Sequence, residues 1–387
     1  EVQPRPQGAP AWADTPRQGN AVSDPVVLVS HGFQPSYEKA FANGLARNGL
    51  AVSVITSDRS LVSAFEPAAQ AIPLPGSQDP RRSPFQKIRR LIAYTASLYA
   101  FLLRGRFRAL HLMGVFITAS VPLGWLEMLG YRLSSRRLLL TVHNLLPHDR
   151  HTRLNRIILQ RIYQMPDTLV VHTRKMRDAL IKEWHIPADR IVQMEHGVDD
   201  LPTKAEAWKP DAQGRLRLLM FGAISRYKGI DIALEALCEF TDFPVSLVIA
   251  GECRDANLAD ELDRLIERIP AMHAVEWRRG FVSESEVQVF FERADAVLLP
   301  YRHIDQSGVL LTAYRFGIPV LAFDVGSFAD YVTHETGVVV TERTPTGLRA
   351  GFRHMKDRLP ELQREKIRTA ARRYLWEETV RVLLPHY

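Results

Sequence analysis

The chain has 387 residues, more than one hydrophobic core usually accommodates, so we expect two domains. Its 46% hydrophobic and 24% charged residues are typical of a globular protein, and its two cysteines exclude a disulfide framework and favour a reducing compartment. A formal charge of +7 favours anionic partners, such as phosphorylated metabolites, nucleic acid or an anionic membrane surface.

The first 23 residues are rich in Pro, Gln and Ala and lack the apolar core of a signal peptide, so we expect a disordered arm at 1–23. No run of about 18 uncharged apolar residues follows, and we expect no membrane span. These features favour a cytoplasmic protein, with room for peripheral contact at the inner face of the plasma membrane.

Short apolar runs alternate with amphipathic stretches along the rest of the chain. We predict strands at 25–30, 51–56, 108–113, 137–142 and 167–172, and a second series at 216–221, 245–250, 296–300, 319–323 and 337–340. Strand–helix alternation predicts parallel sheets covered by helices, and the continuous Val/Leu/Ile runs predict strands buried on both faces. A polar stretch with two prolines at 199–214 separates the series and is typical of an interdomain linker. Ligands of such sheets bind at the carboxyl ends of the strands.

The first predicted strand ends in Ser30-His31-Gly32, with a helix expected near Tyr37. A single glycine does not make the G-x-G-x-x-G pattern, so a dinucleotide site is weakly supported. Gly32 can still let a ligand lie against the backbone.

Residues 81–110 carry eight Arg and Lys and no acidic residue, and their middle is helical, apolar and aromatic. Such a helix, with Arg89 and Arg90 on it, indicates a membrane-surface element or a site for an anionic acceptor. The alternative is a core helix whose basic ends are solvated. Nucleic acid is disfavoured because no nucleic-acid motif appears.

His143 falls just beyond the carboxyl end of the strand at 137–142, followed by His148 and Asp149. A histidine at this edge can be a structural hydrogen-bonding group, a base or a charge stabiliser. A metal site is poorly supported because no second ligand cluster accompanies the three residues.

Gly222 directly follows another predicted strand, and Arg226 and Lys228 come shortly after it. The glycine allows close backbone approach, and a guanidinium with an ammonium suits a diphosphate. A solvated loop with a helix start at Lys228 is the alternative.

The stretch 303–320 passes from polar residues into a helix and back into an apolar strand. Ser307 is a suitable N-cap, and the N–H groups from Gly308 onward can bind an anion. Asp305 would face an uncharged part of that ligand, such as sugar hydroxyls. The alternative is an ordinary capped helix.

Motifs in a specific order carry a family resemblance: HGF at 31–33, TVHNLLPHD at 141–149, VHTRKM at 171–176, EHGVD at 195–199, LLMFGAISRYKGID at 218–231, IAGE at 249–252, ADAVLLPYR at 294–302, SGVLLTAYRFGIPVLA at 307–322 and YLWEE at 374–378. The chain resembles the GT-B nucleotide-sugar glycosyltransferases, in particular the retaining family 4. The resemblance implies an α/β fold of two facing Rossmann-like domains with a cleft between them. The acceptor domain would span 24–200 and the donor domain 201–370, with a helix at 371–387 crossing back to the first.

By matching position, Arg226 and Lys228 would neutralise the leaving diphosphate, which the backbone of Ser307, Gly308 and Val309 would also contact. Asp305 and His143 would lie at the donor sugar, and both would count as catalytic together with Arg226 and Lys228. His31, Gly32, Arg89 and Arg90 would lie on the acceptor side. Thr312 departs from the pattern, because the family has a glutamate there that binds the nucleotide ribose. The spacing from Asp305 to Thr312 is also one residue shorter than in the family's pattern.

The resemblance implies transfer of a sugar from a UDP- or GDP-sugar to an acceptor hydroxyl with retention of configuration and without a metal or other cofactor. The basic segment 81–110 favours a lipid-linked or polysaccharide acceptor. A membrane-associated sugar-nucleotide binding protein with weakened catalysis and a GT-B epimerase are the alternatives. An NAD-dependent oxidoreductase is disfavoured because neither strand series supplies G-x-G-x-x-G.

Overall fold

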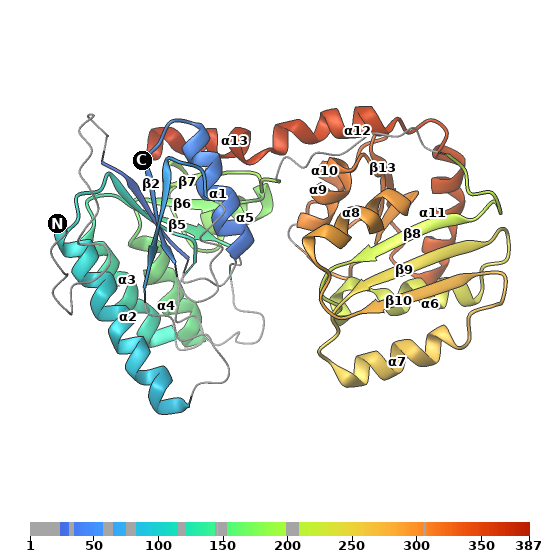
Figure 1. Cartoon of the computed structure of the whole chain (residues 1–387), viewed down its shortest axis with the longest axis horizontal. Helices are drawn as coiled ribbons and strands as arrows, with labels where there is room; N and C mark the ends of the chain where they lie inside the picture. The colour runs from blue at the N-terminus through green and yellow to red at the C-terminus, as the bar shows by residue number, and fades with distance from the viewer. Residues whose placement is uncertain are drawn as a thin grey trace, which may run out of the picture. The chain divides into compact units, whose positions relative to one another are not determined.

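The computed structural model describes residues 24–30, 35–56, 65–74, 83–114, 121–143, 145, 153–198, 209–304 and 307–387. The chain forms two compact units (Figure 1). The first runs to Val171 and adds Arg177–Met194 and Val380–Tyr387, and the second consists of His172–Met176 and Glu195–Thr379. Each unit contains one parallel sheet with helices, which confirms the predicted α/β fold with two Rossmann-like domains. The predicted arm at 1–23 and linker residues 199–208 lie outside the described residues, so the boundary at 200 stays a prediction.

The first unit has a seven-stranded sheet in the order β3-β2-β1-β4-β5-β6-β7, with parallel pairing throughout. Its strands are β1 (Val26–Val29), β2 (Val52–Thr56), β3 (Ala69–Pro73), β4 (Ala109–Leu112), β5 (Leu138–Val142), β6 (Thr168–Val171) and β7 (Ile191–Gln193). Its helices are α1 (Pro35–Arg47), α2 (Pro84–Arg104), α3 (Val121–Ser134), α4 (Arg153–Gln164) and, from its fourth residue on, α5 (Arg174–Lys182). Helices α2, α3 and α4 follow one another along one side of this sheet (Figure 1).

The second unit has a six-stranded parallel sheet in the order β10-β9-β8-β11-β12-β13. Its strands are β8 (Leu216–Phe221), β9 (Val245–Gly251), β10 (Ala274–Arg279), β11 (Ala296–Leu299), β12 (Val320–Phe323) and β13 (Gly337–Val340). Its helices are α6 (Ile230–Cys238), α7 (Ala256–Ile266), α8 (Glu284–Arg293), α9 (Gly308–Arg315), α10 (Phe328–Tyr331), α11 (Pro345–Arg358), α12 (Arg364–Ala371) and α13 (Trp376–Thr379), with a 3-10 turn, η3, at Arg226–Lys228.

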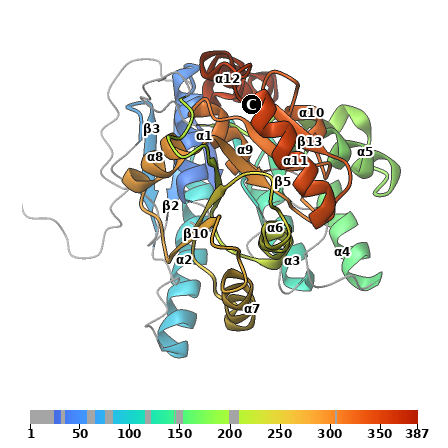
Figure 2. The ribbon, with the colours of Figure 1, turned by 90° about the vertical axis from the view of Figure 1, so that its right-hand side faces the viewer.

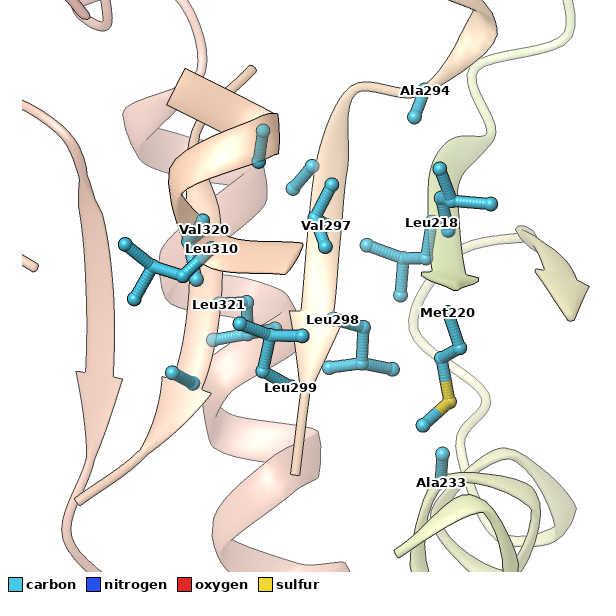
Figure 3. Packing of buried hydrophobic residues seen from close by; sticks show 14 of the residues in the cluster. Leu218, Met220, Ala233, Ala294, Val297, Leu298, Leu299, Leu310, Val320 and Leu321 are labelled. Atoms are coloured by element: carbon cyan, nitrogen blue, oxygen red, sulfur yellow. The ribbon is translucent and has the colours of Figure 1, made fainter. Parts of the chain in front are cut away.

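Strands β8, β11 and β12 form the centre of the second unit, and their side chains are buried on both faces. Figure 3 shows Leu218 and Met220 of β8 beside Leu298 of β11 and Leu321 of β12, all 2% exposed or less. Leu310 of α9 joins the same cluster. This packing fixes the carboxyl ends of β8 and β11, which are followed by the loops that carry the candidate site.

The chain ends on the first unit. The segment η5 (Val380–His386) packs against α1 and β7. The hydroxyl of Tyr387 lies 2.6 Å from Nδ1 of His111, a fully buried β4 residue, and the carbonyl of Tyr387 accepts a hydrogen bond from Arg137. These contacts anchor the last residues to the middle of the first sheet.

Candidate functional site

The first loop of the site begins where β8 ends. Gly222 has φ +91°, a conformation that L side chains rarely adopt, and its N–H bonds the carbonyl of Ala250 at 2.9 Å. A methyl group placed on Gly222 would lie 2.9 Å from Lys228 Nζ and 3.8 Å from Val309 Cγ2. The loop after β8 therefore meets the start of α9, and the structure brings together three of the residues predicted to bind the donor.

The Lys228 side chain is buried where the loop after β8 meets the start of α9. It is 5% exposed, its Nζ donates to the Phe221 carbonyl at 2.6 Å, and Nζ lies 5.8 Å from the centre of the Tyr301 ring. Burial lowers the pKa of Lys228 to about 8. Burial disfavours the charged form of this lysine, and an anion bound beside it would stabilise that form. Next to Gly222, Lys228 is thus well suited to a phosphate group.

Arg226 lies on the same 3-10 turn, but its side chain is bound elsewhere. Its guanidinium makes a bidentate pair with Glu261 of α7, at 3.2 and 2.7 Å, and is largely exposed. This pairing raises the pKa of Arg226. Sequence reasoning placed Arg226 and Lys228 together on one diphosphate, and that assignment stays a prediction because Arg226 would have to share its guanidinium between Glu261 and a ligand.

The loop after β11 is locked to this turn by a second arginine. Arg302 makes a bidentate pair with Asp231 at 2.8 and 2.6 Å and also donates to the Arg226 carbonyl at 2.9 Å. The Arg302 backbone N–H donates to the Tyr227 carbonyl at 2.7 Å. These bonds hold the two loops of the site in a fixed relation.

Helix α9 begins at Gly308 with Ser307 at the N-cap position, but the Ser307 side chain makes no capping hydrogen bond. Instead, the buried hydroxyl is hydrogen-bonded with Tyr301, a bond that opposes the rise in the pKa of Tyr301 caused by burial. The predicted N-cap position of Ser307 is therefore confirmed, although its side chain does not bond the helix backbone. Gly308 is exposed, with open space where a Cβ would be. The backbone at this helix start can be approached closely by a ligand.

Thr312 lies one turn into α9 and is half-buried. Its Oγ1 donates to the Gly308 carbonyl at 2.9 Å, the bond that threonine often makes within helices. The hydroxyl proton is therefore engaged, and Thr312 has only acceptor lone pairs to offer a ligand. Asp305, which was predicted to hold the donor sugar, lies outside the described residues.

In the first unit, His143 follows β5 as predicted. Its Nε2 lies 3.0 Å from the Met113 carbonyl, which can only accept, so Nε2 carries a proton. The ring packs edge-on against Tyr37, with centroids 5.1 Å apart. Burial lowers the pKa of His143, and the bond to Met113 opposes the effect. A neutral ring at this position favours a structural or hydrogen-bonding role over that of a fixed positive charge.

The predicted acceptor-side residues divide into two groups. His31 and Gly32 lie outside the described residues. Arg89 and Arg90 lie in the first half of α2, where Arg89 is exposed and Arg90 half-buried. Among the described residues, no three His, Cys, Asp or Glu side chains lie close enough together to hold a metal ion.

Sequence reasoning missed Tyr301, Glu261 and the Arg302–Asp231 pair. Tyr301 and Arg302 follow β11 and belong to the motif ADAVLLPYR at 294–302, so their place at the carboxyl end of this strand could be predicted. Their partners are distant in sequence, and no local pattern indicates such pairs.

Two family models match the chain. Glycosyltransferase Family 4 matches residues 36–200, and Glycosyl transferases group 1 matches residues 215–356. Together they cover most of both units.

Curated relatives share about a quarter of their aligned residues with the chain. A glycogen synthase from Mycobacterium tuberculosis is 26% identical over 212 residues, which are 54% of this chain and 49% of that protein. A GDP-mannose:glycolipid 4-beta-D-mannosyltransferase from Xanthomonas campestris pv. campestris is 26% identical over 198 residues, 51% of this chain and 53% of that protein. The chain thus spans about half the length of these relatives.

Solved structures match over nearly the whole chain. A sucrose-phosphate synthase from Thermosynechococcus elongatus has a TM-score of 0.66 at 17% identity, covering 92% of this chain and 96% of that one. The Anabaena protein HepE in complex with UDP-glucose has a TM-score of 0.65 at 12% identity, covering 94% and 98%. At such identities the likeness shows the shared fold alone.

Proposed function

The chain belongs to the GT-B glycosyltransferases of the family 4 type, and we propose that it moves a sugar from a nucleotide-diphosphate sugar to an acceptor hydroxyl. The observation that carries this proposal is the corner formed by Gly222, Lys228 and Val309, where a buried ammonium and a helix start meet at the carboxyl ends of β8 and β11. Such a corner favours a diphosphate.

The chemistry follows from the charges that develop. Breaking the bond between the sugar and the diphosphate leaves an oxyanion, while the sugar carbon becomes oxocarbenium-like. The Lys228 ammonium and the N–H groups from Gly308 onward would stabilise the oxyanion electrostatically. In this proposal no metal or cofactor takes part. Undiminished turnover after exhaustive treatment with a chelator is the expected result, and restoration of lost activity by an added divalent cation would contradict it.

We propose retention of configuration, through a same-face reaction in which the leaving phosphate oxygen takes the proton of the acceptor hydroxyl. The bond from the anomeric carbon to the phosphate oxygen breaks as the bond to the acceptor oxygen forms. His143 and Asp305 would hold the donor sugar in this step. The anomeric configuration of the new glycosidic bond, compared with that of the donor sugar by proton NMR, tests the idea, and inversion would refute it.

The donor is proposed to be UDP- or GDP-linked. The Anabaena neighbour is described in complex with UDP-glucose, and the name of the Xanthomonas relative specifies GDP-mannose. A screen of both series, with release of UDP or GDP followed by mass spectrometry, identifies the base and the sugar. If a donor raises the melting temperature of the protein but is not converted, whether or not the acceptor is present, a sugar-nucleotide binding protein would be favoured instead.

The acceptor is proposed to be a lipid-linked or polysaccharide intermediate at the inner face of the plasma membrane. This proposal is supported by the glycolipid and glycogen named for the relatives and by the uninterrupted basic character of 81–110. Incubation of the protein with labelled donor and a membrane extract should transfer label to a lipid-extractable product. Conversion of donor without any acceptor would indicate an epimerase or hydrolase.

A further inference from the structure

Helix α2 consists of two halves that differ in their packing. Its three buried residues, Tyr94, Leu98 and Leu102, all lie in the second half and hold the helix against the first unit. The first nine residues, 84–92, contain no buried residue. In both views of the molecule, α2 extends past the ends of α3 and α4 (Figures 1 and 2). We call residues 84–92 the projecting half of α2.

The projecting half is helical because of its own sequence rather than because of packing. Ser83 and Gln86 form a capping box, in which each side chain accepts a hydrogen bond from the other residue's backbone N–H, at 3.3 and 3.1 Å. Pro84 occupies the first helical turn, where proline is favoured. A helix start that is encoded locally but packs on no core indicates an element whose partner lies outside the unit.

Its side chains segregate into two faces. Phe85, Ile88 and Ile92 follow at intervals of three and four, which places them on one face, and they are 76%, 59% and 64% exposed. The remaining positions include Lys87, Arg89 and Arg90. No acidic residue occurs anywhere in α2, and among the described residues Lys87 and Arg89 form no ion pair. Large exposed apolar side chains, on a helix that carries cations and no carboxylate, mark an interaction surface.

We propose that the projecting half of α2 docks the protein on an anionic membrane surface, with Phe85, Ile88 and Ile92 inserted among the lipids and the basic residues at the headgroups. A short helix with these two faces has the chemistry of an interfacial element. A second copy of the chain fits poorly, because pairing two such faces would bring uncompensated cations together. The described part of the chain contains no helix long and apolar enough to cross a membrane, so this is contact at the surface.

The inference deepens the proposed function, on which its biological meaning rests, because it gives the unit expected to bind the acceptor a lipid surface from which to take it. The docking itself is independent of catalysis. It can therefore be tested without donor or acceptor.

The experiment is co-sedimentation of the full chain with vesicles of phosphatidylglycerol and phosphatidylcholine against vesicles of phosphatidylcholine alone. The protein should bind the anionic vesicles and lose binding at high salt, because salt screens charges. The double variant Phe85→Gln/Ile92→Gln should reduce partitioning about tenfold or more, and Arg89→Gln about fivefold. Phe281→Gln is the matched control, since Phe281 is an 81% exposed aromatic residue of the second unit, and it should bind as the wild type does.

Because these side chains are exposed, circular dichroism and the melting temperature should not change in any variant. Light scattering should show no change of mass in the double variant. Binding to anionic vesicles that is unaffected by both the apolar and the charge variants would overturn the proposal, and so would a wild-type dimer that the double variant dissociates. Nucleotide release from a soluble donor, measured on the same samples, reports separately on the proposed function.

Discussion

Replacing Lys228 by methionine should separate stability from activity. Methionine replaces the apolar stem of the lysine side chain and removes the ammonium, which is buried and donates to the Phe221 carbonyl at 2.6 Å. In the proposed function this charge faces the leaving diphosphate. Without a bound anion the same charge destabilises the folded state, because burial lowers the pKa of Lys228 from 10.5 to about 8.

The size of the effect follows from that pKa. A drop from 10.5 to about 8 means that carrying the proton costs the folded state about 3 kcal/mol relative to the unfolded chain. Methionine relieves this cost but leaves the Phe221 carbonyl without its donor, a loss of about 1–3 kcal/mol. The free energy of unfolding at neutral pH should therefore stay the same or rise by up to about 2 kcal/mol. Turnover should fall on the order of 10²-fold or more, the scale for losing one preorganised electrostatic group.

The pH dependence gives an internal check. The penalty on Lys228 is fully present below pH 8 and disappears as the pH rises towards 10.5, because the unfolded chain then loses its proton too. The stability gained by the methionine variant should shrink over the same range. Melting temperatures from pH 6 to 10 and initial rates of nucleotide release are the two measurements.

Lys356→Met is the matched control. Lys356 also donates to a carbonyl, that of Gly214, and lies over an aromatic ring, that of Phe243, but it belongs to α11, outside the predicted site. Its replacement should leave turnover unchanged. If Lys228→Met keeps near-normal turnover, or loses activity only in proportion to unfolding, the reasoning about the diphosphate is refuted.

Three further predictions concern the same corner. Gly222→Ala should lower the free energy of unfolding by about 1 kcal/mol because of its positive φ, and should weaken nucleotide binding further, because the methyl group would crowd Lys228 Nζ; calorimetric titration and thermal melting separate the two. Thr312→Glu should strengthen binding of the nucleotide diphosphate about tenfold by restoring a charge-assisted contact to ribose, while Thr312→Val should weaken it several-fold; unchanged affinity in both variants would remove Thr312 from the site. Binding of the nucleotide diphosphate at pH 8 should take up about half a proton onto Lys228, detected as heats that depend on the ionisation enthalpy of the buffer, and this uptake should vanish in Lys228→Met.

The sequence predicted every central strand and one of the four edge strands, β13. All ten predicted strands are present within a residue or two of their expected ends. The three that were missed, β3, β7 and β10, each lie at the edge of a sheet. An edge strand need not be buried on both faces, and β10 accordingly alternates between exposed and half-buried residues rather than forming an apolar run. The apolar run that identified the central strands is therefore missing from β10, whereas the edge strand β13 has such a run, GVVV, and was predicted.

For the candidate site, positions along the chain were predictable and side-chain partners were not. A strand followed by a glycine and then a cation placed Gly222 and Lys228 at the carboxyl ends of the strands. A second strand followed by Ser307 placed the start of α9 at the same end of the sheet. The pairing of Arg226 with Glu261 of α7 and the contact of Ser307 with Tyr301 depend on tertiary neighbours. A cation in a motif can reach a ligand or a neighbouring carboxylate, and only the fold decides between them.

The residue at position 312 affects how the free energy of donor binding is divided between the ribose and the diphosphate. A glutamate at this position could accept two hydrogen bonds from a ribose with full charge, whereas the Thr312 hydroxyl already donates to the Gly308 carbonyl and retains only acceptor lone pairs. A ribose hydroxyl can therefore make one neutral hydrogen bond there, which is worth roughly half of a charge-assisted one. In the proposed function, more of the affinity for the donor must then come from the diphosphate and from Lys228. Because burial lowers the pKa of that ammonium to about 8, the affinity of this chain for its donor should fall as the pH rises through 8, and isothermal titration across pH 6 to 10 measures the change.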